Sequence, residues 1–115
     1  GGRELLVILK RKKEIEELIQ EGEEIKADFI KVIKNVNVTV SSNSYFGNPY
    51  NIYCSWIDPD SKKEIQLKSD NLWEDPEPII KEHNISTFKV FMDSNNKKKY
   101  YIDTRPIEEL YEKEM

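Results

Sequence analysis

Two short runs of alternating apolar and polar residues, joined by a polar turn, constrain the fold more than any other feature of the chain. In the first run, one face carries Tyr50, Ile52, Cys54 and Trp56. In the second run, Ile65 and Leu67 alternate with polar neighbours. Between the runs stand residues that favour turns, namely Asp58, Pro59, Asp60 and Ser61. A period of two is typical of a half-buried strand, so residues 50–68 are predicted to form a β-hairpin.

The apolar stretch before this hairpin predicts a bent strand. Over residues 24–40 the apolar positions are first odd and then, from Ile30 onward, even. This shift of one residue predicts a β-bulge near Phe29–Lys31, which would coil the strand and help to close a barrel. The polar residues 41–49 that follow are predicted to form a loop.

The C-terminal half predicts a second hairpin. Residues 88–92 and 100–102 alternate on either side of a polar turn at residues 93–98. Residues 69–83, which separate the two hairpins, are predicted to be irregular because two prolines exclude a central strand there.

Helices are predicted at both ends of the chain. Residues 3–21 contain no glycine or proline, and Gly22 is the predicted C-terminal stop. A proline is predicted to start a short helix over residues 107–114, with Leu110 and Tyr111 on its apolar side.

These segments predict a mainly β fold, a small antiparallel barrel or sandwich of five or six strands with an N-terminal helix and a short C-terminal helix. A chain of 115 residues supports one domain with one core. We therefore expect residues 23–115 to form a single compact β domain, preceded by a juxtamembrane helix over residues 1–22. The single cysteine excludes an intrachain disulfide.

Charge is distributed unevenly along the chain, whose net charge is −4. Residues 1–13 hold five basic residues against one acidic residue, a net charge of +4, whereas residues 14–24 hold six acidic residues. The overall charge, and the lack of a basic groove pattern in residues 25–115, predict no nucleic-acid partner.

The order of charges at the N-terminus predicts a membrane tether. The apolar residues 5–9 precede a basic cluster at Lys10–Lys13, the pattern found just beyond a membrane span on its cytoplasmic side. Five apolar residues are far fewer than the ~20 that cross a bilayer, so residues 5–9 would be the tail of a span that lies upstream. The alternative is a soluble amphipathic helix that packs on the domain.

A set of residues spread over the chain resembles an uncharacterised family of small bacterial membrane-anchored domains. The matching residues are Tyr50, Trp56, Asp58-Pro59, Ser69, Leu72-Trp73, Asp75-Pro76, Val90, Asp93 and Lys99–Asp103. The resemblance implies one or two N-terminal transmembrane helices followed by a compact β domain at the cell membrane. It implies no activity.

No catalytic, cofactor-binding or metal-ligating residue is predicted. Cys54 and His83 would be the only Cys–His pair, but Cys54 stands in the middle of a strand and is interpreted as a buried, inert thiol. Six carboxylates, which would suit a divalent cation if they gathered at one end of the hairpin, are Asp58, Asp60, Asp70, Glu74, Asp75 and Glu77. They lack the glycine and distal glutamate of a calcium loop.

Trp73 is the most suggestive residue, because it stands in the segment predicted to be irregular. The favoured interpretation is that it buries itself as a plug at one end of the barrel. The alternative is a binding anchor, since tryptophan dominates binding hot spots. An aromatic platform for single-stranded nucleic acid, from Tyr45, Phe46, Tyr50 and Tyr53, is disfavoured by the missing basic groove.

We therefore predict a non-catalytic interaction domain on the cytoplasmic face of a bacterial membrane. It would bind a protein or peptide through a strand edge or through the loop around Trp73. The candidate partner-binding residues are Trp73, Glu74, Asp75, Tyr45 and Phe46. The alternative is a sensor that binds a small molecule or divalent metal at the barrel mouth.

Overall fold

The computed structural model describes residues 2–35 and 48–114, and their side chains over residues 9–35 and 48–113. The elements follow the order α1 (Gly2–Glu21), β1 (Glu23–Lys34), β2 (Tyr50–Ile57), β3 (Glu64–Lys68), α2 (Glu77–Glu82), β4 (Thr87–Asp93), β5 (Asn96–Ile102) and α3 (Arg105–Glu114).

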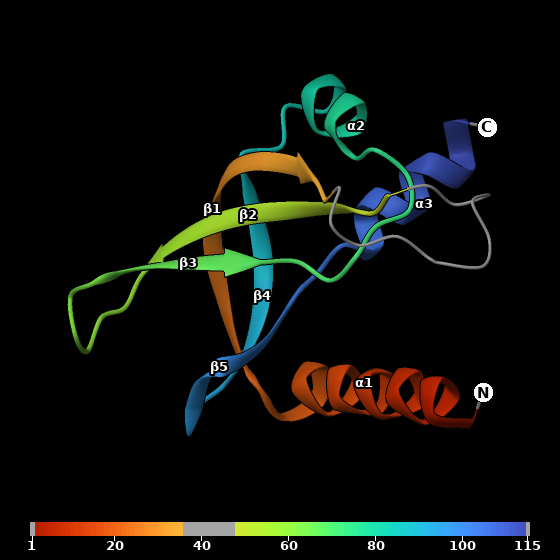
Figure 1. The fold of residues 1–115 in the computed structure, drawn as a ribbon. Helices are drawn as coiled ribbons and strands as arrows, with labels where there is room; N and C mark the ends of the chain where they lie inside the picture. The colour runs from red at the N-terminus through yellow and green to blue at the C-terminus, as the bar shows by residue number, and fades with distance from the viewer. Residues whose placement is uncertain (1, 36–47, 115) are drawn as a thin grey trace.

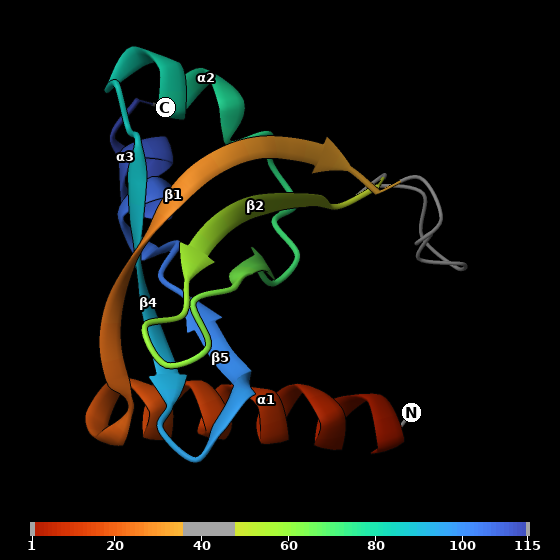
Figure 2. The ribbon, with the colours of Figure 1, turned by 90° about the vertical axis from the view of Figure 1, so that its left-hand side faces the viewer.

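The five strands of the described residues form one antiparallel sheet in the order β3-β2-β1-β4-β5. The sheet curls into a half-barrel, with α2 and α3 near one end and α1 running across the other (Figures 1 and 2). The predicted mainly β fold, with its N-terminal helix and short C-terminal helix, is confirmed.

Strand β1 is the bent element that the two halves of the sheet share. Its residues 23–28 pair with β4, and its residues 28–34 pair with β2. The register shifts between Phe29 and Lys31, which confirms the predicted β-bulge. Ile30, the first of the even-numbered apolar positions, is the extra residue of the bulge and is 45% exposed. The predicted continuation of the strand beyond Lys34 lies mostly outside the described residues.

The main core fills the inner side of the curled sheet. Its buried members are Ala27, Ile52, Cys54, Leu67, Leu72, Ile79, Ile80, Phe88, Val90, Met92, Ile102 and Ile107. Seven of these twelve come from alternating positions of the two hairpins, β2 with β3 and β4 with β5, so the predicted hairpins and their inward faces are confirmed. Helices α2 and α3 complete the core through three isoleucines. Burial of this apolar surface is the main stabilising contribution, at about 25 cal/mol per Å².

Helix α1 packs on the opposite face of β4 and β5. Leu18 is buried there between Phe91 and Tyr101, which point away from the main core, and Ile15 and Ile19 lie alongside. The predicted helix is observed, and its residues 15, 18 and 19 pack on the domain, as the alternative of an amphipathic helix requires. None of the helices that the structure describes is long and apolar enough to cross a bilayer.

Gly22 ends α1, as predicted, and the reason is a close approach of backbone atoms. Its amide donates to the Leu18 carbonyl at 2.8 Å. A Cβ atom at this position would lie 2.5 Å from the same carbonyl oxygen and 3.2 Å from the carbonyl oxygen of Met92. Only glycine therefore lets the chain leave the helix and enter β1 directly.

Two segments differ from the sequence prediction. The polar turn predicted at residues 93–98 is tighter, because β5 already begins at Asn96. The segment predicted to be irregular contains the short helix α2, which begins after Pro76 and buries Ile79 and Ile80. Proline suits a first helical turn because its missing N–H has no helical partner there, so the same residues that exclude a strand permit a helix.

Candidate functional site

A groove of about 350 Å³ opens between α3 and the segment that leads from β3 to α2. Figure 1 shows where these two segments lie in the fold. One wall consists of four consecutive residues, Asn71, Leu72, Trp73 and Glu74. The other wall is one side of α3, formed by Ile107, Glu108, Tyr111 and Glu112. Both walls combine apolar or aromatic side chains with carboxylates, which is the composition of a site for an apolar group that carries a positive charge.

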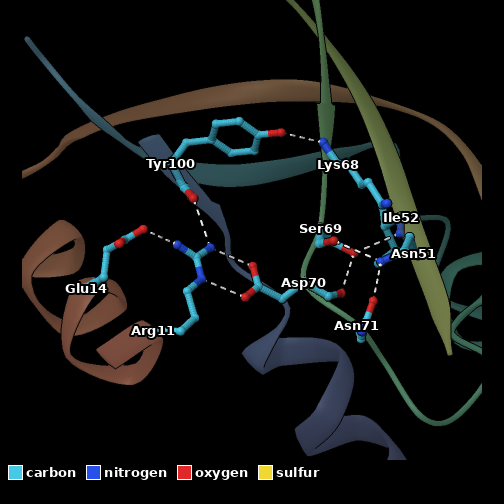
Figure 3. A network of polar contacts seen from close by, with 9 residues as sticks. All are labelled: Arg11, Glu14, Asn51, Ile52, Lys68, Ser69, Asp70, Asn71 and Tyr100. Carbon is cyan, nitrogen blue, oxygen red and sulfur yellow. Dashed lines mark hydrogen bonds and ion pairs between the residues drawn. The ribbon is translucent and has the colours of Figure 1, made fainter. Parts of the chain in front are cut away.

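The first wall is fixed to β2 by hydrogen bonds (Figure 3). The Leu72 amide donates to the Tyr50 carbonyl at 2.8 Å, and the Tyr50 amide donates to the Leu72 carbonyl at 2.7 Å. The buried side chain of Asn51 donates from Nδ2 to the Ser69 carbonyl at 3.0 Å and to Asn71 Oδ1 at 3.1 Å. These bonds order the wall in advance, which lowers the entropic cost of binding a ligand.

The second wall is fixed by the core. Ile107 is 1% exposed, and Leu110 and Tyr111 pack against the core beside it. The apolar side predicted for this helix is therefore confirmed. Residues four apart lie on the same face of a helix. Ile107 and Tyr111 consequently form an apolar row along the groove, and Glu108 and Glu112 form an acidic row next to it.

Trp73 lies at the surface, with 43% of its area exposed, so the favoured interpretation as a buried plug is wrong. Leu72, at 7% exposed, takes the buried position instead. The cause is the backbone pairing of Leu72 with Tyr50, because successive side chains of an extended segment point to opposite sides. With Leu72 turned inward, Trp73 faces the groove from outside the core.

The groove is acidic. Three carboxylates line it, those of Glu74, Glu108 and Glu112, and the part of the chain that the structure describes contributes no lysine or arginine to its lining. Partial desolvation raises the pKa of Glu108 above its ordinary value of 4.5, and the negative charges of Asp103 and Glu112 raise it further. The negative potential favours a cationic ligand over an anionic one.

The other candidate residues have different positions. Asp75 does not line the groove; its Oδ1 accepts a hydrogen bond from the Glu77 amide at 3.0 Å, where α2 begins. Tyr45 and Phe46 lie outside the described residues. Of the five candidates, the structure therefore brings together Trp73 and Glu74 at the groove.

The carboxylates considered for a metal site are divided among separate contacts. Lys97 Nζ lies 2.7 Å from Asp58 Oδ1 and 2.9 Å from Asp60 Oδ2. The Asp70 carboxylate is paired with Arg11. Within residues 2–35 and 48–114 there is no group of three or more His, Cys, Asp or Glu side chains that could hold a metal ion.

Cys54 is fully buried, as predicted, and burial raises the pKa of its thiol to about 12. His83 is exposed at the end of α2. The thiol is therefore protonated at neutral pH, which does not suit a nucleophile.

Polar side chains join the edge strands β3 and β5 across the open side of the half-barrel; we call these contacts the seam (Figure 3). The Lys68 amide donates to the Tyr100 hydroxyl at 2.9 Å. Arg11 of α1 donates to both carboxylate oxygens of Asp70, at 2.7 and 2.8 Å, and to the Tyr100 carbonyl at 3.1 Å. Its third nitrogen contacts Glu14. The seam therefore links α1 directly to the segment that continues into the groove wall.

Sequence reasoning missed Arg11, Asn51 and the acidic row of α3. In the sequence Arg11 is one residue of the basic cluster, and Asn51 stands on the face of its strand opposite Ile52 and Cys54; neither position predicts the partners that these side chains have. The sequence could have indicated the row of Glu108 and Glu112, because two like charges four residues apart destabilise a helix and so suggest a role outside the helix itself.

Comparisons of the chain with family models, with curated proteins and with solved structures gave no significant match. The resemblance to a family of membrane-anchored domains therefore stays a prediction.

Proposed function

We propose that this chain is a non-catalytic interaction domain that binds a segment of a partner protein in the groove between residues 71–74 and α3. The observation that carries the proposal is Trp73, which is 43% exposed beside a groove whose two walls are fixed by hydrogen bonds and by the core. A large aromatic side chain held on a rigid scaffold gives much contact area at little entropic cost.

Trp73→Ala tests this proposal. Because Trp73 lies outside the core, the free energy of unfolding of the variant is expected to lie within about 0.5 kcal/mol of that of the unchanged protein. Peptides selected on the unchanged protein from a displayed library of random 12-residue sequences are expected to bind Trp73→Ala at least about tenfold more weakly, as for a hot-spot residue. Thermal melting and fluorescence anisotropy with a labelled peptide measure the two quantities.

Ile57→Ala is the matched control, since Ile57 is 65% exposed but lies at the end of β2 and not in the groove. This variant is expected to bind the selected peptides normally. If no peptide is selected, or if the selected peptides bind Trp73→Ala and the unchanged protein equally, the groove is not the binding site.

We also propose that the domain is tethered to the cytoplasmic face of a membrane through a span preceding α1. The support is the order of the sequence, apolar residues 5–9 followed by Lys10–Lys13, and the exposure of Lys10, Lys12 and Lys13. The coding sequence upstream of residue 1 is expected to encode ~20 apolar residues, and the full-length protein to fractionate with membranes. A polar upstream sequence would contradict the tether without affecting the groove.

A further inference from the structure

The negative charge of the groove determines which kind of peptide can bind there. The inference below rests on the proposed function, namely that the groove binds a segment of a partner protein. We infer that the bound segment is a basic amphipathic peptide. A lysine or arginine of this peptide lies against Glu108 and Glu112, and a neighbouring apolar side chain packs against Trp73.

The acidic row is the first support. Glu108 and Glu112 stand four residues apart on α3, so their carboxylates repel each other and destabilise the helix. Glu74 faces the same space from the other wall. A cation bound among these carboxylates removes the repulsion, and a lysine or arginine supplies that cation on a stem long enough to lie along apolar surface.

The second support is that the nearby cations of the chain are used elsewhere. Arg105 begins α3, but its Nε lies 2.8 Å from Asp103 Oδ1 and its Nη2 lies 3.0 Å from Asp103 Oδ2. Lys113 is in the last turn of α3 and does not line the groove. The carboxylates of the groove therefore receive no balancing charge from the lysines and arginines that the structure describes along its walls.

The aromatic residues give the third support. Trp73 and Tyr111 flank the groove from opposite walls, and the buried side chains of Leu72 and Ile107 add apolar surface to the same two walls. Aromatic faces attract cations and also pack against aliphatic side chains. An acidic peptide would meet three carboxylates at the same surface, which excludes it by like-charge repulsion.

The composition of the selected peptides is the first test. The random library is selected in parallel on the unchanged protein and on Trp73→Ala, and sequences enriched only on the unchanged protein are read. These sequences are expected to carry a net positive charge and at least one apolar residue beside a lysine or arginine. Enriched sequences that are neutral or acidic would overturn the inference, although the groove would remain the binding site.

The carboxylates are tested on one enriched peptide with two double variants of equal net charge. Glu108→Gln with Glu112→Gln is expected to raise the Kd about three- to tenfold. Glu109→Gln with Glu82→Gln, at exposed positions outside the groove, is expected to change the Kd less than about twofold. Circular dichroism melting confirms that both variants fold.

Equal weakening by the two double variants would mean that only the overall charge matters, and no weakening by either would mean that only apolar contact matters. Each result overturns the inferred role of Glu108 and Glu112. Loss of all peptide selection, or equal binding to Trp73→Ala, would instead refute the proposed function, so the two failures can be told apart.

Discussion

At the scale of single residues, local backbone pairing decides which side chains are available for function. Leu72 and Trp73 are sequence neighbours of similar apolar character, yet one is buried and the other faces solvent, because the Leu72 amide and carbonyl both bond to Tyr50. A similar rule applies to Ile30, which the bulge excludes from the core. In both cases the backbone hydrogen bonds, and not the apolar character of the side chain, decide whether the residue is buried.

Cys54 gives a prediction at this scale. Burial raises the pKa of its thiol to about 12, so the reactive thiolate is scarce at neutral pH and the sulfur is enclosed by the core. The folded protein is expected to resist alkylation by iodoacetamide for hours, and the urea-unfolded chain to react within minutes. Mass spectrometry measures the modified fraction over time. Rapid alkylation under native conditions would show that the core around Cys54 opens.

The residues that could be predicted from the sequence are those in runs with a clear period. The inward positions of β2, β4 and β5 follow from alternation, and the bulge follows from a shift in it. Trp73 could not be placed, because a single bridged pair leaves no period in the sequence. Arg11 could not be placed either, since its partners Asp70 and Tyr100 lie 59 and 89 positions away. The half of the groove on α3 was missed for the same reason, namely that it depends on packing between distant segments.

At the scale of secondary-structure elements, the structure depends on how helices attach to the curled sheet. Helix α1 uses Leu18 to pack on β4 and β5, and uses Arg11, two turns earlier, to reach the seam. Helix α3 uses Ile107 for the core and leaves its acidic row facing the groove. Each of these two helices thus packs on the sheet or core through apolar side chains, and the neighbouring segments determine which contacts its polar side chains make.

The ion pair between Arg11 and Asp70 is predicted to hold α1 against the sheet. Arg11→Ala is expected to lower the free energy of unfolding by about 1–2 kcal/mol, because a charged donor with several hydrogen bonds is lost from a partly buried site. Arg11→Lys is expected to restore little, since an ammonium group cannot pair with both carboxylate oxygens and the Tyr100 carbonyl in the same way. Urea unfolding followed by circular dichroism measures both values.

A double-mutant cycle with Asp70→Ala isolates the pair. The coupling energy is expected to be about 0.5–1.5 kcal/mol. Lys12→Ala, at an exposed position on the same helix, is the control and is expected to change stability by less than about 0.5 kcal/mol. A coupling energy near zero would mean that Arg11 and Asp70 contribute independently.

At the scale of the whole molecule, the stability of the fold depends on pH through carboxylates whose pKa values are shifted in opposite directions. Hydrogen bonds from Lys97 and from the Asp60 amide hold the pKa of Asp58 below its ordinary value of 3.8. Burial alone would raise the pKa of Asp103, but the hydrogen bonds and charge of Arg105 outweigh it and lower the pKa. Glu108 differs, because partial burial and its acidic neighbours raise its pKa.

The sign of each shift predicts the pH dependence of stability. The contributions of Asp58 and Asp103 are complete above their ordinary pKa of 3.8 and are lost as the pH falls through their lower folded-state values. Unfolding free energies from urea titrations are therefore expected to fall between about pH 5 and pH 2, and Asp58→Asn and Asp103→Asn to flatten this decline.

The variant Glu108→Gln should show the opposite sign. In the unchanged protein, the ionised carboxylate of Glu108 lowers the stability of the fold once the pH rises above 4.5. The substitution is therefore expected to stabilise the protein at pH 7 by up to about 0.5 kcal/mol after solvent screening. The difference should vanish in acid, where the carboxyl group is protonated in both states. A stability difference that does not change with pH would contradict the raised pKa.

The seam has a consequence for how copies of this chain behave together. A half-barrel leaves two strands that are paired on one side only, and such strands recruit strands of other molecules. Here the Tyr100 hydroxyl occupies the Lys68 amide, and Arg11 covers the Tyr100 carbonyl. Helix α1 therefore also reduces the tendency of the edge strands to pair with strands of other molecules. A shortened chain that starts at Gly22 would expose the Tyr100 carbonyl, together with the apolar side chains of Phe91 and Tyr101 that Leu18 covers, and would be prone to aggregation even where its main core is complete.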